Sequence, residues 1–419
     1  MPIVTNFFIK CQKSLLIALL TAITYYSAIN RYHTLPWVIA AFMLATLIVG
    51  FVMPRLLLKN LSITRTFQSK SHENQSITLE VSVKNTGWMP AFVVEAVDRL
   101  PFIEAALGDK ETKDKLLGII SYIPAKFNHH FEVSLKCEKR GLYALGPIKL
   151  TSSFPLGLIE SSQQRSESID YLTIYPYVFP IKSLPLFGSP NEIHRGSFLL
   201  PKNKGSTEFS GIREYRRGDH PRHIHWLTTA RLNQLMVKEF EPIASARIYL
   251  ALDLSATSNI GKGKHSTAEY SISIAASICG YASENNITTS LYAEGNTQLW
   301  VREGVGNYHF QHILEALAVI DVVGKVPYTR ILERAASECR FGDTVIVFIS
   351  QDKNQAIKTL QYIAQMQSEG IGIIAIVFDI NSFSSKAIDA VSASVNMSAL
   401  NVPSITIKNG DDLLRRFNT

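Results

Sequence analysis

The sequence is poor in the residues that mark several classes of protein. Its four cysteines, Cys11, Cys137, Cys279 and Cys339, lie far apart and form no CxxC pair, so neither a disulfide framework nor a zinc knuckle is indicated and a reducing compartment fits best. Charged residues make up only 18% of the chain against 46% hydrophobic residues, which excludes a disordered polar chain. Lysine plus arginine exceeds aspartate plus glutamate by only 42 to 35, without a long basic run, so nucleic-acid binding is not indicated.

Catalytic signatures are missing as well. There is no GxSxG elbow and no HExxH pair, and the glycine–lysine stretch at 261–264 lacks the spacing of a phosphate-binding loop. A cysteine–histidine pair stays open, although a cysteine in an apolar run, such as Cys279, is typical of a core. We therefore predict a protein that binds and does not catalyse, with a metal-dependent hydrolase as the alternative.

Two apolar runs open the chain, over residues 14–29 and 35–53, with only a short polar stretch between them. Each run approaches the roughly 20 residues that cross the hydrocarbon layer of a bilayer. A secretory signal peptide is the competing interpretation, but the second run follows at once and no small-x-small cleavage site closes the first. Residues 1–60 are therefore predicted to form a transmembrane helical hairpin.

Basic residues flank these runs unequally. Lys10 and Lys13 precede the first run, basic residues at 55, 59 and 65 follow the second, and Arg31 alone lies between them. Positive-inside counting then places both ends of the hairpin, and with them the soluble domains, in the cytoplasm. An extracellular adhesin of reversed topology is the alternative.

The segment from 61 to 175 changes to a period of two. Apolar residues alternate with polar ones over 77–83 and again over 131–135, and turn formers such as Asn85-Thr86-Gly87 separate the strands. This pattern predicts a small antiparallel β-sandwich, interpreted as a rigid spacer or contact module. Prolines at 176, 180, 185 and 190 then predict a linker, which opens the segment 176–245.

The densest polar segment runs from Gly205 to Arg231 with the spacing GxxEFxGxREYxxGDxxRxIxWxxxAR. Its arginines could pair in bidentate fashion with its acidic residues, either on a recognition surface or in an internal salt-bridge lattice. Histidines at 220, 223 and 225 invite zinc, but no acidic or cysteine partner has ligand spacing, so packing beside Trp226 is favoured. The residues that define this signature are Glu208, Arg213, Glu214, Tyr215, Gly218, Asp219, Trp226 and Arg231.

Residues 246–419 read as alternating strands and helices. Strands are predicted at 247–253, 288–293, 344–350, 371–378 and 404–408, and helices at 309–320, 329–339, 355–368 and 411–417. Ser266 and Glu269 resemble a capping box that opens a further helix. Such alternation predicts a mostly parallel, doubly wound α/β sheet, whose ligands bind beyond the carboxyl ends of the strands.

At that edge, directly after the first of these strands, come Asp253, Ser255 and Thr257. A carboxylate and two hydroxyls at alternate positions can face one hard cation such as Mg²⁺. The alternative is that Asp253 merely caps a helix or a turn.

The run from Gly205 to Glu241 resembles the signature of the bacterial domain-of-unknown-function family 58. The segments KRGLY at 139–143, LGP at 145–147 and FPLGL at 154–158 resemble the preceding part of that family, and the paired apolar runs resemble its usual start. The resemblance covers nearly the whole chain. It implies a von Willebrand A-like domain at the C-terminal end and a partner among AAA ATPases of the MoxR class, in protein maturation or complex assembly.

The resemblance also implies how the cation site would be completed. Asp253-Leu254-Ser255-Ala256-Thr257 is similar to the DxSxS motif of metal-ion-dependent adhesion sites, with Thr257 where serine is usual. Later loops of such domains add a threonine and an aspartate, for which Thr329 and Asp352 are the nearest matches, Asp352 standing one residue further from its strand than expected. The expectation is a bacterial inner-membrane protein-binding factor with cytoplasmic domains, whose Mg²⁺ accepts a carboxylate from a partner protein.

Overall fold

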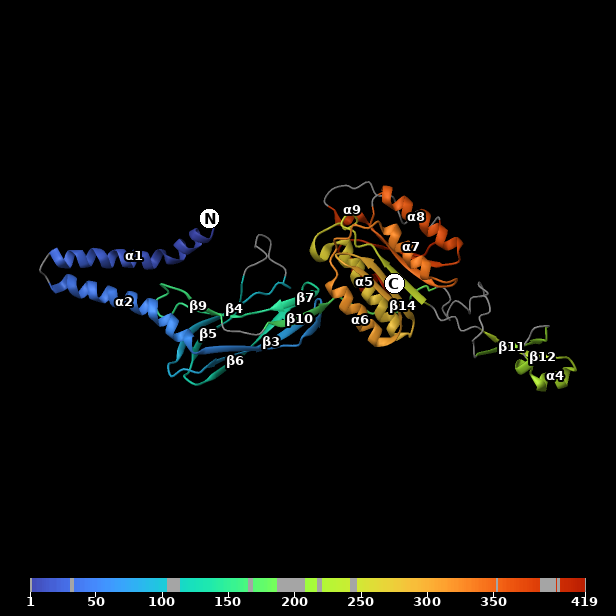
Figure 1. Cartoon of the computed structure of the whole chain (residues 1–419), viewed down its shortest axis with the longest axis horizontal. Helices are drawn as coiled ribbons and strands as arrows, with labels where there is room; N and C mark the ends of the chain where they lie inside the picture. The colour runs from blue at the N-terminus through green and yellow to red at the C-terminus, as the bar shows by residue number, and fades with distance from the viewer. Residues whose placement is uncertain are drawn as a thin grey trace. The chain divides into compact units, whose positions relative to one another are not determined.

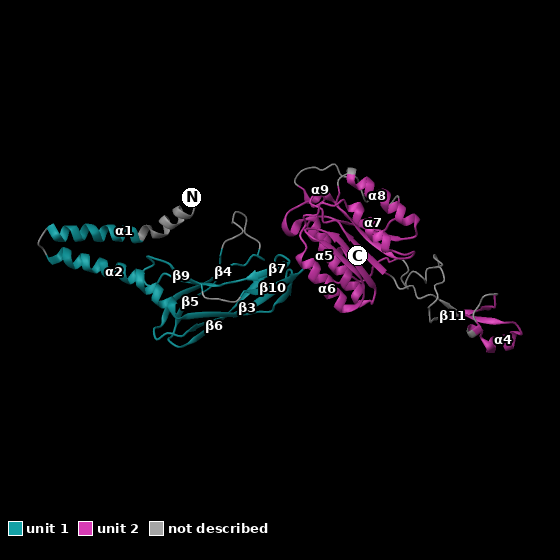
Figure 2. Ribbon diagram, in the orientation of Figure 1, with its two compact units in different colours: residues 1–175 teal, residues 176–419 magenta. Residues whose placement is uncertain are grey.

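The computed structural model of the chain describes residues 2–30, 34–103, 114–164, 169–186, 208–216, 221–241, 247–351, 353–384, 397 and 400–418. The chain divides into two compact units, residues 1–175 and residues 176–419, which Figure 2 shows in different colours. The finer division into four segments stays a prediction.

Two apolar helices begin the first unit (Figure 1). They are α1 (Pro2–Asn30) and α2 (Thr34–Lys59), and the ring of Tyr25 on α1 meets that of Trp37 on α2 edge-on, with 5.5 Å between centroids. In the described part of the chain, α2 is the helix long and apolar enough to cross a membrane, by length and composition. The apolar part of α1, Ser14–Asn30, is shorter, so the second span of the predicted hairpin is not established.

The C-terminal end of α2 is part of a protein core. Leu57 and Leu58 are buried, and Gly50 lies so close to the sheets that a Cβ atom there would stand 2.9 Å from Cδ1 of Leu158. The helix therefore leads directly into the β-rich part of the unit.

Ten strands follow, in three sheets. They are β1 (Leu61–Thr66), β2 (Lys70–His72), β3 (Ser76–Asn85), β4 (Ala91–Asp98), β5 (Lys115–Ile123), β6 (Asn128–Lys136), β7 (Gly141–Leu145), β8 (Lys149–Ser152), β9 (Ser161–Gln164) and β10 (Asp170–Tyr175). The sheet orders are β1-β3-β6, β5-β4-β8-β9 and β2-β10-β7, antiparallel throughout except that β2 runs parallel to β10. The two strands predicted from alternation are confirmed as β3 and β6, which pair with Val81 opposite Phe131. All three sheets contribute side chains to one hydrophobic core.

One buried arginine joins these three sheets. Arg65, on β1, is 3% exposed, and its Nη1 lies 2.6 Å from Oδ2 of Asp98, on β4, which is 1% exposed. Its Nε lies 2.8 Å from Oδ2 of Asp170, on β10, and its Nη2 donates to the carbonyl of Leu145, on β7. The guanidinium, carried by one sheet, thus satisfies acceptors from the two other sheets of the unit.

The second unit begins with the proline-bearing stretch that we expected to be a linker. In its described part, residues 176–186, the N–H of Phe179 donates to Oγ of Ser277 at 3.0 Å, and the Phe179 ring packs against that of Phe417 at a tilt, with 5.4 Å between centroids. Phe179 is 1% exposed. This part is packed against its own unit and is not a free linker, because proline prevents a strand from donating but does not prevent burial of its neighbours.

The signature segment forms a small hairpin within this unit. Strands β11 (Glu208–Glu214) and β12 (Met236–Glu241) pair antiparallel, and the connection between them holds the 3-10 turn η1 (Pro221–His223) and helix α4 (Trp226–Leu232).

The rest of the unit is built on a mixed six-stranded sheet in the order β15-β14-β13-β16-β17-β18. Its strands are β13 (Arg247–Leu252), β14 (Thr288–Glu294), β15 (Gln298–Gly304), β16 (Thr344–Ile349), β17 (Gly372–Phe378) and β18 (Ser404–Ile407). Only β15 runs antiparallel to its neighbour. The helical elements are η2 (Gly263–His265), α5 (Thr267–Glu284), α6 (Gly306–Val319), α7 (Tyr328–Glu338), α8 (Lys353–Ser368), α9 (Ile380–Phe383) and α11 (Leu413–Asn418).

Helices cover both faces of this sheet (Figure 1), with α5 and α6 on one face and α7 and α8 on the other. Strands β16 and β17 are buried along their whole length, which is why their sequences are continuous apolar runs and do not alternate. The predicted α/β class is confirmed. Helix α5 begins where the capping box predicted it, with the Ser266 hydroxyl accepting from the N–H of Glu269.

The order of the strands creates one special position. The chain starts at the centre with β13, adds β14 and β15 on one side, and returns to add β16, β17 and β18 on the other. The loops that leave β13 and β16 therefore diverge to opposite faces, and the carboxyl ends of these two adjacent strands form the switch point at which open α/β sheets bind ligands.

Candidate functional site

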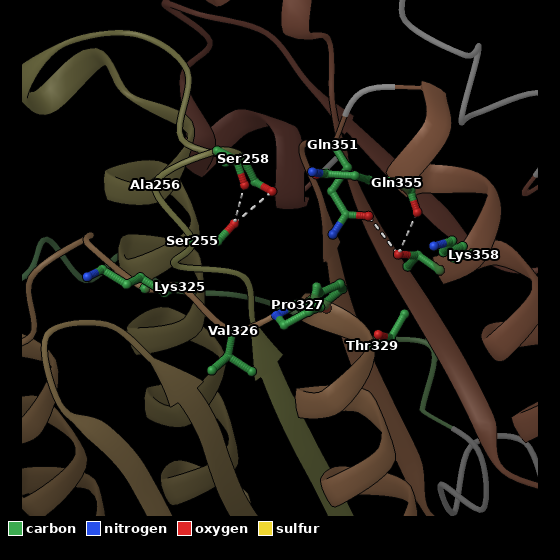
Figure 3. A pocket seen from close by; sticks show the side chains of 14 residues that line it. Ser255, Ala256, Ser258, Lys325, Val326, Pro327, Thr329, Gln351, Gln355 and Lys358 are labelled. Atoms are coloured by element: carbon green, nitrogen blue, oxygen red, sulfur yellow. Dashed lines mark hydrogen bonds between the residues drawn. The ribbon is translucent and has the colours of Figure 1, made fainter.

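A pocket of about 520 Å³ lies at this switch point (Figure 3). Its walls come from the loop after β13, the segment that enters α7, Gln351 just beyond β16 and the first turns of α8. We call it the switch-point pocket. Its volume falls in the range of roughly 300–1,000 Å³ that ligand pockets occupy.

Asp253 follows β13 and faces inward, not toward solvent. It is 4% exposed, its Oδ1 accepts from the N–H of Ser255 at 3.1 Å, and its Oδ2 accepts from Nε2 of Gln351 at 2.8 Å. Burial raises the pKa of the Asp253 carboxyl, and the hydrogen bonds from Gln351, Ser258 and Ser255 oppose that rise. The carboxylate is thus held behind the pocket wall by neutral donors.

The two hydroxyls of the predicted motif do reach the pocket. Ser255 and Thr257 both line it, and the Oγ of Ser255 donates to Oγ of Ser258 at 2.9 Å while lying 3.4 Å from Oγ1 of Thr257. The turn 253–257 and the serine that follows it therefore bring together one carboxylate and the hydroxyls of Ser255, Thr257 and Ser258.

A backbone bridge brings the second predicted segment alongside this turn. The N–H of Gly324 donates to the carbonyl of Leu254, and the N–H of Ala256 donates to the carbonyl of Gly324, both at 3.1 Å. Only glycine fits at 324, because a Cβ atom there would lie 2.2 Å from the carbonyl oxygen of Glu294. The bridge aligns residues 325–329 with the turn, so Thr329 lines the same pocket, as predicted.

Tyr328 fixes the start of α7 at the split between the two central strands. Its hydroxyl donates to the carbonyl of Ala251, on β13, at 2.7 Å and accepts from the N–H of Phe348, on β16, at 3.0 Å. Burial raises the pKa of Tyr328 well above its ordinary value of 10.0, which keeps the hydroxyl protonated and able to donate. The phenol takes the place of a direct strand-to-strand hydrogen bond.

Gln351 occupies the position opposite Asp253. The predicted partner Asp352 lies outside the described residues, and its neighbour Gln351 is the residue whose amide meets Asp253. The Oε1 of Gln351 accepts from Oγ1 of Thr359, on α8, at 2.6 Å. Sequence reasoning missed Gln351, Tyr328 and Thr359, although the end of an apolar strand was a signal for Gln351.

These residues test how well a magnesium ion would fit. The described residues include no group of three His, Cys, Asp or Glu side chains placed to hold a metal. The outer oxygen of Asp253 is already taken by the Gln351 amide, which an ion would have to displace. A magnesium ion, which prefers several oxygen ligands, would thus have to break the bond between Gln351 and Asp253 before it could use that carboxylate oxygen, and the predicted cation stays a prediction.

Three of the signature residues, Glu208, Arg213 and Glu214, lie on β11, and Tyr215 follows it directly. Gly218, Asp219 and the side chain of Glu208 lie outside the described residues. Nη1 of Arg213 donates to the carbonyl of Glu214 at 2.9 Å, and the N–H of Tyr215 donates to the carbonyl of Leu235 at 2.8 Å. The described contacts are thus local to the hairpin.

Helix α4 carries the remaining signature residues. Trp226, its first residue, is 68% exposed, and Arg231 stands in its last turn. His225 is the N-cap: its Nδ1 accepts from the N–H of Thr228 at 3.3 Å. A capping role accounts for this histidine without zinc.

Comparison with known proteins gives a family match for part of the chain. A sequence model of the family described as "Protein of unknown function DUF58" matches residues 211–362. The uncharacterized protein YeaD of Bacillus subtilis (strain 168) is 28% identical over 215 residues, which make up 50% of this chain and 50% of that protein. The chain thus spans about half the length of the curated relative that it matches.

The solved structures with some likeness to this chain do not extend the family match. The CARDB domain of a Pyrococcus furiosus protein gives a TM-score of 0.18 at 13% identity, over 27% of this chain and 91% of that one. A β-glucosidase from Listeria innocua in complex with gluconolactone gives 0.18 at 11% identity, over 27% of this chain and 16% of that one. Likeness at this level carries no argument about fold or function.

Proposed function

We propose that this chain is a membrane-anchored protein-binding factor that holds a segment of a partner protein in the switch-point pocket. The observation that carries the proposal is the pocket itself, which lies at the switch point of an α/β sheet and is lined by hydroxyls and exposed side chains. Its described lining holds no His, Cys, Asp or Glu side chain that could act as a general base. Binding suits this lining better than hydrolysis does.

The second unit is, in this proposal, a von Willebrand A-like domain. Two features support it: the central strand is followed by strands on one side and then on the other, with one antiparallel edge strand, and the loop after the central strand carries the Asp253-Ser255-Thr257 motif. The second of these is a feature that the resemblance to family 58 led us to expect.

The membrane anchor of the proposal is α2. Only 11% of its most apolar stretch is buried, and Leu35, Leu44 and Val52, which point in different directions round the helix, are 69%, 52% and 42% exposed. Apolar side chains exposed all round a helix suit lipid better than water. The basic residues at both ends of the predicted hairpin support the proposal that the soluble units lie in the cytoplasm, at the bacterial inner membrane.

The partner in this proposal is an AAA ATPase of the MoxR class, in keeping with the family resemblance, and the work they share is protein maturation or complex assembly. The test is a pull-down of the tagged full-length chain from detergent-solubilised native membranes, with mass spectrometry of what is retained. We expect an AAA ATPase among the retained proteins. A second tagged membrane protein of the same cell serves as the control, and retention of no ATPase beyond that control would remove the partner.

Orientation needs its own experiment. Reporters fused after Lys59 are expected to be active only if they are of a kind that works in the cytoplasm. Activity confined to the outer side of the membrane would favour the adhesin of reversed topology.

A further inference from the structure

We infer that the switch-point pocket binds an acidic peptide segment directly, through the ammonium groups of Lys325 and Lys358 and without a bridging metal ion. This inference rests on the proposed function, because it names the kind of segment that the pocket would hold. It departs from the cation-mediated contact that the sequence motif suggested.

The charge of the pocket lining is positive. Lys325 and Lys358 are the charged side chains among the described residues that line it. Both are exposed, and within the described part of the chain neither ammonium group forms an ion pair. A carboxylate entering the pocket would therefore meet two available cations on flexible stems.

The carboxylate of Asp253, behind the pocket wall, already has its donors within the protein. Asp253 accepts from Gln351 and from Ser255, and Gln351 is itself fixed by the hydroxyl of Thr359. These neutral donors weaken the repulsion between the Asp253 carboxylate and an acidic ligand, so a metal ion is not needed to make the interaction attractive. Two carboxylates facing the pocket would have required a metal ion between them and the ligand.

The arrangement fits an extended ligand better than a single small anion. Figure 3 shows Lys325 and Lys358 at opposite ends of the pocket, with Val326 and Pro327 between them. The two cations are therefore set to meet acidic side chains at separate points of one peptide, while Val326 and Pro327 contact its apolar parts. The hydroxyls of Thr257 and Thr329 line the same space and can donate to carboxylate or backbone oxygens.

The experiment uses the full chain in a neutral detergent. A fluorescently labelled synthetic peptide rich in Glu, and its counterpart with every Glu replaced by Gln, are titrated at low salt by anisotropy, once with EDTA and once with Mg²⁺. The variants are Lys325→Gln, Lys358→Gln and the double variant, with Lys182→Gln as a matched control. Lys182 is an exposed lysine of the same unit that does not line the pocket.

We expect the Glu peptide to bind equally well in EDTA and in Mg²⁺, and the Gln peptide not to bind. Each pocket variant should weaken binding by about two- to fivefold, the range for one exposed ion pair, and the double variant by about tenfold. The control should bind as the wild type does. Thermal unfolding of each variant checks that the fold is kept.

Three results would overturn the inference: no binding of the Glu peptide, binding that requires Mg²⁺, or binding that both lysine substitutions leave unchanged. The proposed function fails separately. If the ATPase is retained in the pull-down but the Glu peptide does not bind, the partner stands and the lysine pocket falls. If the Glu peptide binds through the lysines but no ATPase is retained, the pocket stands and that partner falls.

Discussion

Removing one hydroxyl, with the substitution Tyr328→Phe, tests how the switch-point pocket is held open. In the folded chain this hydroxyl bonds the carbonyl of Ala251 and the N–H of Phe348, which belong to the two central strands. Tyr328 is 3% exposed, so water cannot easily replace the lost group. Phenylalanine keeps the ring and its packing and leaves two buried backbone groups without their partner.

The magnitude follows from those two groups. A buried donor or acceptor left unsatisfied costs about 1–3 kcal/mol, and partial closure of the strands would recover some of this, so we expect a loss of about 2–4 kcal/mol in the free energy of unfolding. For a unit of this size each kcal/mol lowers the melting temperature by about 2–4 °C, which gives a shift of about 4–16 °C. Thr329, the next residue, should lose its fixed place in the pocket wall.

Two measurements check this, thermal unfolding and hydrogen exchange. The amide of Phe348 should exchange faster in Tyr328→Phe, because its acceptor is gone. Tyr308→Phe is the matched control, since Tyr308 is 91% exposed and lies on α6. A melting temperature and exchange rate equal to those of the control would refute the role given to the hydroxyl.

Three further substitutions have expected outcomes. Arg65→Met strands a buried carboxylate and should lower the free energy of unfolding by about 3–5 kcal/mol in denaturant titrations, whereas Arg99→Met, at a side chain 70% exposed, should change it by less than about 1 kcal/mol. Burial raises the pKa of Asp253 in the folded chain above 3.8, so the ionised carboxylate destabilises the fold. Asp253→Asn should therefore raise the melting temperature at pH 7, and this gain should vanish as the pH falls toward 3.8. A gain that does not depend on pH would contradict this. Gln351→Glu sets two carboxylates face to face, so Mg²⁺ should raise its melting temperature while leaving that of the wild type unchanged.

Much of the second unit could be predicted from local patterns. Continuous apolar runs bounded by turn residues located β13, β14, β16, β17 and β18, and a serine three residues before a glutamate located the start of α5. These signals are local, because burial on both faces and helix capping depend on a few neighbouring residues. The edge strand β15 escaped, since Val301 is its one fully buried residue and the strand carries neither a clear run nor a clear alternation.

The pocket was predictable in place but not in detail. Parallel strands bring their carboxyl ends to one edge, so the loop of Asp253 and the position of Thr329 could be expected to converge there. The hydroxyl of Tyr328, in contrast, donates to the carbonyl of Ala251, 77 positions away in the sequence. No local pattern around either residue predicts this hydrogen bond. Such contacts depend on the tertiary register of the strands, which a single sequence does not display.

The direction in which Asp253 points decides what the edge of this sheet can do, and a residue 98 positions away sets that direction. An aspartate with a free outer oxygen would invite a cation. Here the amide N–H of Gln351 donates to that oxygen, and the amide oxygen of Gln351 accepts from the hydroxyl of Thr359. The hydrogen bonds that the carboxylate needs are thus made within the protein. The side chains left facing the pocket are then hydroxyls and ammonium groups, and their charge favours an acidic ligand without any ion between. In our proposal, the side chain at position 351 decides whether this DxSxT turn recognises a ligand directly or through an ion.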